Sequence, residues 1–208
     1  MDFGKIFNQV LDAAQQELKK TANGNSTMDN ITKVGGGAAV VGLLSMLLGR
    51  SGGSKLAKLG TLAALGSIAY QAYQSYQAKQ NQPATAEEAD FSLEDNDSVA
   101  KLVLQTMIAA AASDGEISAE EIQAINAEAG NDPELQQWLN QQMQQPATIA
   151  EISQKVGKNQ ALAAQVYLAA RVVCKEMSRK EVIFLANLAE SLELNEQFVD
   201  ELEKQAGF

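Results

Sequence analysis

The stretch 33–79 constrains this chain more than any other, because it contains no aspartate or glutamate. Nine of the fifteen glycines lie between Gly35 and Gly66, among alanines, leucines and valines. Each glycine in a water-exposed helix costs about 1 kcal/mol relative to alanine. That composition suits neither a folded soluble core nor a polar linker. We therefore expect residues 33–79 to enter a membrane as a Gly/Ala-rich apolar helical hairpin.

The hairpin would consist of two halves separated by the polar segment 50–55. Residues 34–49 and 59–76 carry no charged side chain, but each half is shorter than the about 20 apolar residues that cross a bilayer. One membrane pass and two passes therefore both remain open. An alternative is that this arm does not enter lipid, and instead self-associates or stays poorly ordered in water.

Two further features of the stretch favour lipid. Small residues recur four positions apart, as at Gly35 and Ala39, a spacing that lets helix backbones approach closely inside membranes. Aromatic residues that suit the membrane–water interface cluster near the end of the stretch, at Tyr70, Tyr73 and Tyr76. We expect contact with membrane lipid over residues 34–76.

Charge is distributed unequally along the chain. Residues 1–84 carry eight basic and four acidic side chains, whereas residues 85–208 carry eight basic and 22 acidic side chains. The basic half favours an anionic lipid surface. The acidic half excludes nucleic acid as a partner, because contacts with phosphates require clustered cations.

Residues 1–32 are predicted to form an amphipathic helix followed by a polar loop. The charged residues scattered through this segment are not typical of a cleavable signal peptide. The helix would lie in a membrane interface, or pack on a partner or on its own copy in an oligomer. Its apolar positions recur at helical spacing, at Phe3, Ile6, Phe7, Val10, Leu11, Ala14 and Leu18.

Residues 80–97 are predicted to be an acidic linker, and residues 98–208 an all-helical domain of about seven helices. Asn195 is expected to cap the last helix. Other helix starts are marked by capping boxes, in which two side chains satisfy backbone N–H groups of the first turn. The boxes are Ser118 with Glu121, Thr148 with Glu151, and Ser178 with Glu181.

The chain offers few residues for catalysis. It has no histidine, the commonest general base and metal ligand. Its single cysteine, Cys174, cannot form an intrachain disulfide, and its apolar helix position predicts a core residue and not a reactive thiol. We predict that the protein is not an enzyme.

The motif at residues 109–121, AAAASDGEISAEE, resembles the signature of tellurite-resistance TerB-like domains. A Gly/Ala-rich first half followed by such a domain is similar to the YebE-like bacterial inner-membrane proteins of unknown function. The resemblance implies an all-α TerB-like helical bundle and an inner-membrane location. It also implies a divalent metal site at Asp114, Glu116 and either Glu120 or Glu121.

The same acidic residues have a purely structural interpretation. Asp114 and Gly115 would form a turn, and Ser118 with Glu121 would cap the helix that follows. Residues 177–185 repeat the pattern of residues 117–125, with apolar, Ser, Glu and apolar positions at the same spacing. The sequence departs from the family pattern in this second unit, where Cys-Lys-Glu at 174–176 stands in place of an acidic turn. No cofactor is certain, and a divalent ion is the only one that the resemblance suggests.

Together these features predict a membrane-tethered, non-enzymatic protein whose acidic domain faces the cytoplasm. The domain would bind a protein partner or a second copy of itself, with or without a divalent cation. The competing hypothesis is a soluble metal-binding or stress-response domain whose glycine-rich arm drives self-assembly.

Overall fold

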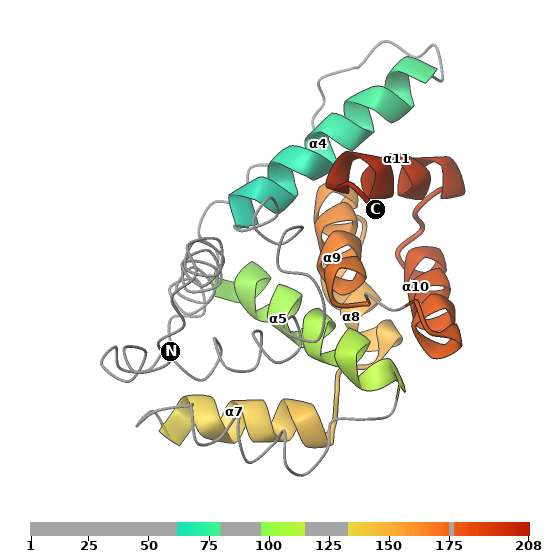
Figure 1. Cartoon of the computed structure of the whole chain (residues 1–208). Coiled ribbons are helices and arrows are strands. Elements are labelled where there is room, and N and C mark those ends of the chain that lie inside the picture. The colour runs from blue at the N-terminus through green and yellow to red at the C-terminus, as the bar shows by residue number, and fades with distance from the viewer. Residues whose placement is uncertain (1–61, 80–96, 115–132, 175–176) are drawn as a thin grey trace, which may run out of the picture.

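The structure, a computed structural model, describes residues 62–79, 97–114, 133–174 and 177–208 (Figure 1). Every regular element within these ranges is a helix, which confirms the predicted all-α class. The helices are α4 (Leu62–Lys79), α5 (Asp97–Ala111), the short 3-10 helix η2 (Ala112–Asp114), α7 (Pro133–Gln144), α8 (Ile149–Val156), α9 (Gln160–Val173), α10 (Arg179–Ser191) and α11 (Glu196–Ala206).

Local side-chain contacts determine where α8 begins and ends. The Thr148 hydroxyl accepts the Glu151 N–H at 3.2 Å, and the Glu151 carboxylate accepts the Thr148 N–H at 2.8 Å. The predicted capping box is therefore confirmed. Hydrogen bonds from the backbone N–H and the hydroxyl of Thr148 hold the pKa of the Glu151 carboxyl below its ordinary value. The helix stops at Gly157, whose φ of 60° strains most residues but not glycine.

The predicted starts of α10 and α11 are confirmed as well. Ser178 accepts the Glu181 N–H at 3.3 Å, and the Glu181 carboxylate accepts the Ser178 N–H at 2.7 Å. Asn195 caps α11 by accepting the Gln197 N–H at 2.9 Å. These caps satisfy backbone donors that have no partner within the helix. Because they are local, they can be identified from the sequence.

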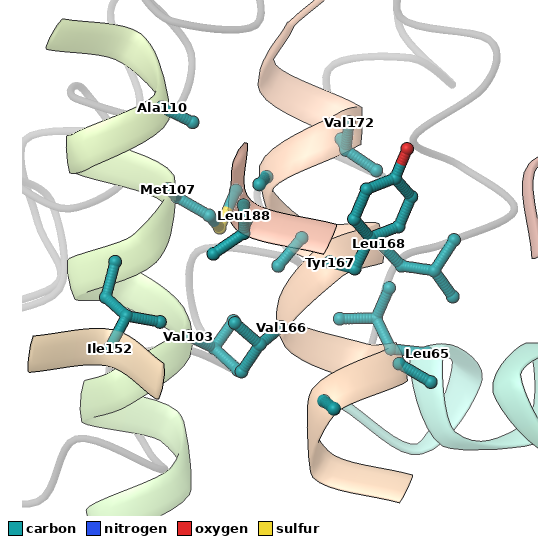
Figure 2. Packing of buried hydrophobic residues seen from close by; sticks show 14 of the residues in the cluster. Leu65, Val103, Met107, Ala110, Ile152, Val166, Tyr167, Leu168, Val172 and Leu188 are labelled. Carbon is teal, nitrogen blue, oxygen red and sulfur yellow. The ribbon is translucent and has the colours of Figure 1, made fainter. Parts of the chain in front are cut away.

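Helix α9 is the central element of the bundle and contacts α4, α5, α8, α10 and α11 (Figure 1). All of residues 161–173 are buried, as expected for a helix that is apolar on nearly every side. Its many alanines let the surrounding helices approach closely. Figure 2 shows side chains of the surrounding helices near α9, among them Leu65 of α4, Val103 and Met107 of α5, Ile152 of α8 and Leu188 of α10.

Helix α4 packs on α9 and α11 as part of this bundle. Leu65, Ala69 and Ala72 are buried in the common core. Toward the end of the helix, the rings of Tyr73 and Tyr76 lie against Phe198 of α11, with centroids 5.9 and 5.5 Å away. Polar contacts with α11 continue along the joint: Lys79 pairs with Glu201, and Gln205 donates to Ser75 at 3.3 Å.

This packing differs from the interpretation of residues 33–79 as one membrane-inserting segment. The last part of that segment supplies core side chains to the bundle, because small residues that suit helix packing in lipid suit packing inside a protein equally well. Glutamines at Gln71 and Gln74 give α4 an exposed polar face. None of the helices in the described ranges is both long enough and apolar enough to span a bilayer.

Several predictions concern residues outside the described ranges. They are the amphipathic helix within residues 1–32, the apolar half at 34–49, the acidic linker before residue 97, and the helix that Ser118 and Glu121 would cap. Within the predicted domain, helices close to the expected positions are present in all the described parts.

Candidate functional site

The residues predicted to bind a metal are only partly placed. Asp114 ends η2, whereas Glu116, Glu120 and Glu121 lie outside the described residues. No group of three or more histidine, cysteine, aspartate or glutamate side chains comes together to hold a metal within the described ranges. The metal site therefore stays a prediction from the family resemblance.

A partly buried polar chain links α5, α7 and α8. Gln105 donates to Gln142 at 2.8 Å, and Lys155 donates to the Gln105 oxygen at 2.7 Å. Gln105 and Gln142 are both buried. Because a buried amide without a partner is costly, this chain holds the three helices in register. Its two buried side chains are neutral amides, which offer neither a nucleophile nor a general base.

A second polar cluster joins α9 to α11. Glu203 accepts hydrogen bonds from the Tyr167 hydroxyl at 2.8 Å and from Arg171 Nε at 3.0 Å. Arg171 also donates to the Cys174 carbonyl at 2.9 Å, and its guanidinium lies 4.2 Å from the centre of the Phe208 ring. The cluster therefore fixes the end of α11 to α9 through charge-assisted bonds and a cation–π contact.

This cluster is unsuited to nucleophilic chemistry. The pKa of Tyr167 is raised far above its ordinary value, most strongly by burial and next by the hydrogen bond to Glu203. The phenol is therefore neutral at physiological pH. The Cys174 side chain is fully buried, as expected from its apolar helix position, so its thiol is shielded from solvent.

The exposed side of α10 has a different character from the rest of the described surface. The exposed large apolar side chains in the described residues are Tyr70, Met177, Val182 and Ile183, and three of these four lie at the start of α10. The exposed fractions of Met177, Val182 and Ile183 are 38%, 43% and 50%. Clusters of this kind mark interaction sites more often than single exposed apolar residues do.

The capping box explains how α10 presents these side chains. Ser178 is the N-cap, so Met177 precedes it and Val182 occupies the fourth helical position, an arrangement in which two apolar side chains commonly pack together. Met177 has a φ of 49°, which is uncommon for a residue with a side chain. Leu185 and Leu188 on the opposite side are buried in the core, which fixes the orientation of the helix.

Charges flank the apolar part of α10 on both sides. Arg179 and Lys180 are exposed in the first turn. Glu190 is exposed in the last turn, and Glu193 is exposed in the connection to α11. Along its solvent side, α10 is therefore basic, then apolar apart from the exposed Asn187, then acidic. We call this surface, from Met177 to Glu193, the α10 face.

A family model described as a protein of unknown function, DUF533, matches residues 33–206. The chain belongs to the DUF533 family. DUF533 is associated with TerB-like domains, which agrees with the resemblance of residues 109–121. The DUF533 match begins before α4 and ends at Ala206, the last residue of α11. It therefore includes both the bundle and the apolar stretch before it. No curated protein and no solved structure matches the chain.

Sequence reasoning did not identify the α10 face on this DUF533 chain, because the Ser178–Glu181 capping box predicts where the helix starts and not which of its sides faces solvent. One signal was available. Residues 182–185 are four consecutive apolar residues, and at about 100° per residue they cover most of the circumference of a helix. On a helix with one side at the surface, such a run cannot turn every side chain toward the core, so some of them face solvent.

Proposed function

We propose that this DUF533 protein is a non-enzymatic protein of the YebE-like kind, tethered to the bacterial inner membrane. Its acidic helical domain binds another polypeptide on the cytoplasmic side through the α10 face. The observation that carries the proposal is the exposure of Met177, Val182 and Ile183 together at one end of one helix. A partner that buries these apolar side chains removes them from water, which lowers the free energy of the complex.

The tether is proposed to lie in residues 34–49, which carry no charged side chain. Only residues 50–61 separate this segment from α4, which is part of the bundle. Twelve residues span at most about 40 Å whatever their conformation. The tether would therefore hold the bundle close to the membrane surface, where it meets partners that share the same membrane.

The character of the buried polar groups supports a binding role over catalysis. The two polar clusters connect helices through partly or fully buried hydrogen bonds, and Tyr167 keeps its proton. The α10 face, in contrast, presents exposed basic, apolar and acidic side chains on one helix. Rigid elements that present apolar anchors with a charged rim are typical of protein-binding surfaces.

Photo-crosslinking in intact cells tests the binding part. A photo-reactive phenylalanine analogue replaces Ile183 in the full-length chain, and the matched control replaces Lys204, which is exposed on α11. We expect a discrete protein adduct from position 183 and little from position 204. No adduct from position 183, or equal labelling at both positions, would contradict the proposed binding surface.

Membrane fractionation tests the tether independently. We expect the full-length chain in the membrane fraction and a variant lacking residues 34–49 in the soluble fraction. After purification, the full-length chain and the shortened variant should give the same circular dichroism signal from the helical bundle. Recovery of the full-length chain without detergent would remove the tether from the proposal and leave the binding surface standing.

A further inference from the structure

The α10 face is self-complementary. Its basic first turn and its acidic end lie on opposite sides of an apolar centre made by Val182, Ile183 and Ala186, all exposed. Arg179 and Glu190 are eleven residues apart, about 16 Å along the helix axis. No exposed acidic residue interrupts the centre, since the Glu181 carboxylate accepts the Ser178 N–H at 2.7 Å within the capping box.

Two such faces match each other in only one of the two ways of aligning them. When two α10 helices lie antiparallel, the basic turn of each meets the acidic end of the other, and the apolar centres meet. When they lie parallel, like charges meet at both ends, which is unfavourable. The antiparallel arrangement is related by a two-fold axis, the commonest symmetry of protein dimers.

We propose that the polypeptide bound by the α10 face is a second copy of this chain, docked antiparallel about a two-fold axis that passes close to residues 184–186. This inference rests on the proposed function, because it names the partner of the same surface. Arg179 of one copy lies opposite Glu190 of the other, and Ile183 lies opposite Ala186. The dimer is formed by the side of α10 that faces away from Leu185 and Leu188.

The size of the surface determines how strong this association is. Stable interfaces bury about 1,200–2,000 Å² in total, and one pair of short helices lies at or below the low end of that range. The dimer is therefore weak and concentration-dependent in dilute solution. A shared membrane raises the effective concentration of the two copies, as any tether does, so the proposed tether and the proposed dimer reinforce each other.

Disulfide trapping between full-length chains tests the geometry. Two copies with different tags are co-expressed, one with Arg179→Cys and the other with Glu190→Cys, and are then oxidised mildly. We expect a mixed disulfide dimer, while either variant alone gives none. Ala186→Cys, close to the axis, is expected to cross-link with itself. Lys204→Cys is the exposed control, and the unmodified chain gives the background from the buried Cys174.

Charge reversal distinguishes docking from chance collision. Arg179→Glu should lower the yield of the Ala186→Cys dimer about fivefold, because both symmetry-related ion pairs become repulsive. Combining Arg179→Glu with Glu190→Arg should restore the yield, since complementarity returns with the opposite polarity. Unchanged melting temperatures of these variants would show that the changes in yield do not come from unfolding.

The experiments distinguish failure of the proposed dimer from failure of the proposed binding surface. Self-linking of Arg179→Cys would overturn the antiparallel geometry. Absence of every cysteine cross-link, together with a photo-adduct from position 183 to a different protein, would overturn the second copy as partner and leave the proposed function intact. Absence of both the cysteine cross-links and the photo-adduct would overturn both.

Discussion

Glu203 connects two helices through two different donors. It accepts the Tyr167 hydroxyl and the Arg171 Nε, and the bond from Tyr167 is 2.8 Å long. The carboxylate is therefore held by a neutral donor and a charged donor at once. Arg171 is itself held by the Cys174 carbonyl and the Phe208 ring, so a single residue change here affects several contacts of α11.

Tyr167 gives a prediction at the scale of one residue. Its pKa is raised above the ordinary value of 10.0, first by burial and then by Glu203. The folded state therefore holds a proton that the unfolded state releases, so the free energy of unfolding should fall as the pH rises above about 10. Denaturant unfolding at several alkaline pH values measures this loss.

Tyr167→Phe should remove most of that pH dependence. It should also lower the free energy of unfolding at neutral pH by about 1–2 kcal/mol, because a hydrogen bond to a charged group is lost. Tyr70→Phe is the matched control, since Tyr70 is exposed. Equal alkaline sensitivity in the two variants would show that Tyr167 is not the residue responsible.

At the scale of one helix, the start of α10 determines the geometry of the proposed interface. The Ser178–Glu181 box fixes the first turn, and Met177 directly before it has a positive φ. Loss of the cap would free the first turn and move the apolar side chains that follow. The stability of α10 and the shape of the α10 face are therefore linked through one hydroxyl.

Ser178→Ala tests this link. It should lower the free energy of unfolding by about 1 kcal/mol, as for other N-cap replacements, whereas Ser178→Asp, which keeps an acceptor, should cost much less. Ser191→Ala, at the exposed end of the same helix, is the control. Chemical denaturation measures all three variants, and equal losses for Ser178→Ala and Ser191→Ala would contradict the role of the cap.

Helix starts and turns were predictable from the sequence because their causes are local. Thr148 and Ser178 act on backbone groups within three residues, and Asn195 within two. The docking of α4 depends on α9 and α11, which lie far away in the sequence, so composition alone could not distinguish protein from lipid around Ala69 and Ala72. The same physics hid the α10 face, because an apolar run does not reveal which residues face solvent.

The candidate metal site could not be tested by sequence reasoning alone. Sequence resemblance selected Asp114 and acidic residues after it, but spacing along the chain does not determine whether their carboxylates converge. Only Asp114 lies in the part of the chain that the structure describes. Convergence of ligands is a tertiary property, and local patterns such as turns and caps account equally well for acidic residues at a helix start.

For the molecule as a whole, α4 is an integral part of the bundle and not a spacer. Ala72 of α4 is fully buried where this helix packs on its neighbours, whereas Ala78 on the same helix is exposed. Ala72→Glu should place an unpaired charge in the core, undock α4 and lower the free energy of unfolding by about 3 kcal/mol or more. Ala78→Glu makes the same chemical change and should cost little.

Amide hydrogen exchange distinguishes local undocking from global loss of structure. In the Ala72→Glu variant, protection should fall first in α4, while α9 retains most of its protection. Equal effects of the Ala72 and Ala78 replacements would mean that α4 is not held where the structure places it.

The order of contacts along α4 has a mechanical consequence. A pull arriving from the N-terminal side enters the bundle at Leu62, so it loads Leu65 first and the ion pair of Lys79 with Glu201 last. The contacts would break in succession, like a strip peeled from one end, instead of sharing the load at once. If residues 34–49 sit in a bilayer, lateral tension in that bilayer would be felt first at the joint between α4 and α9.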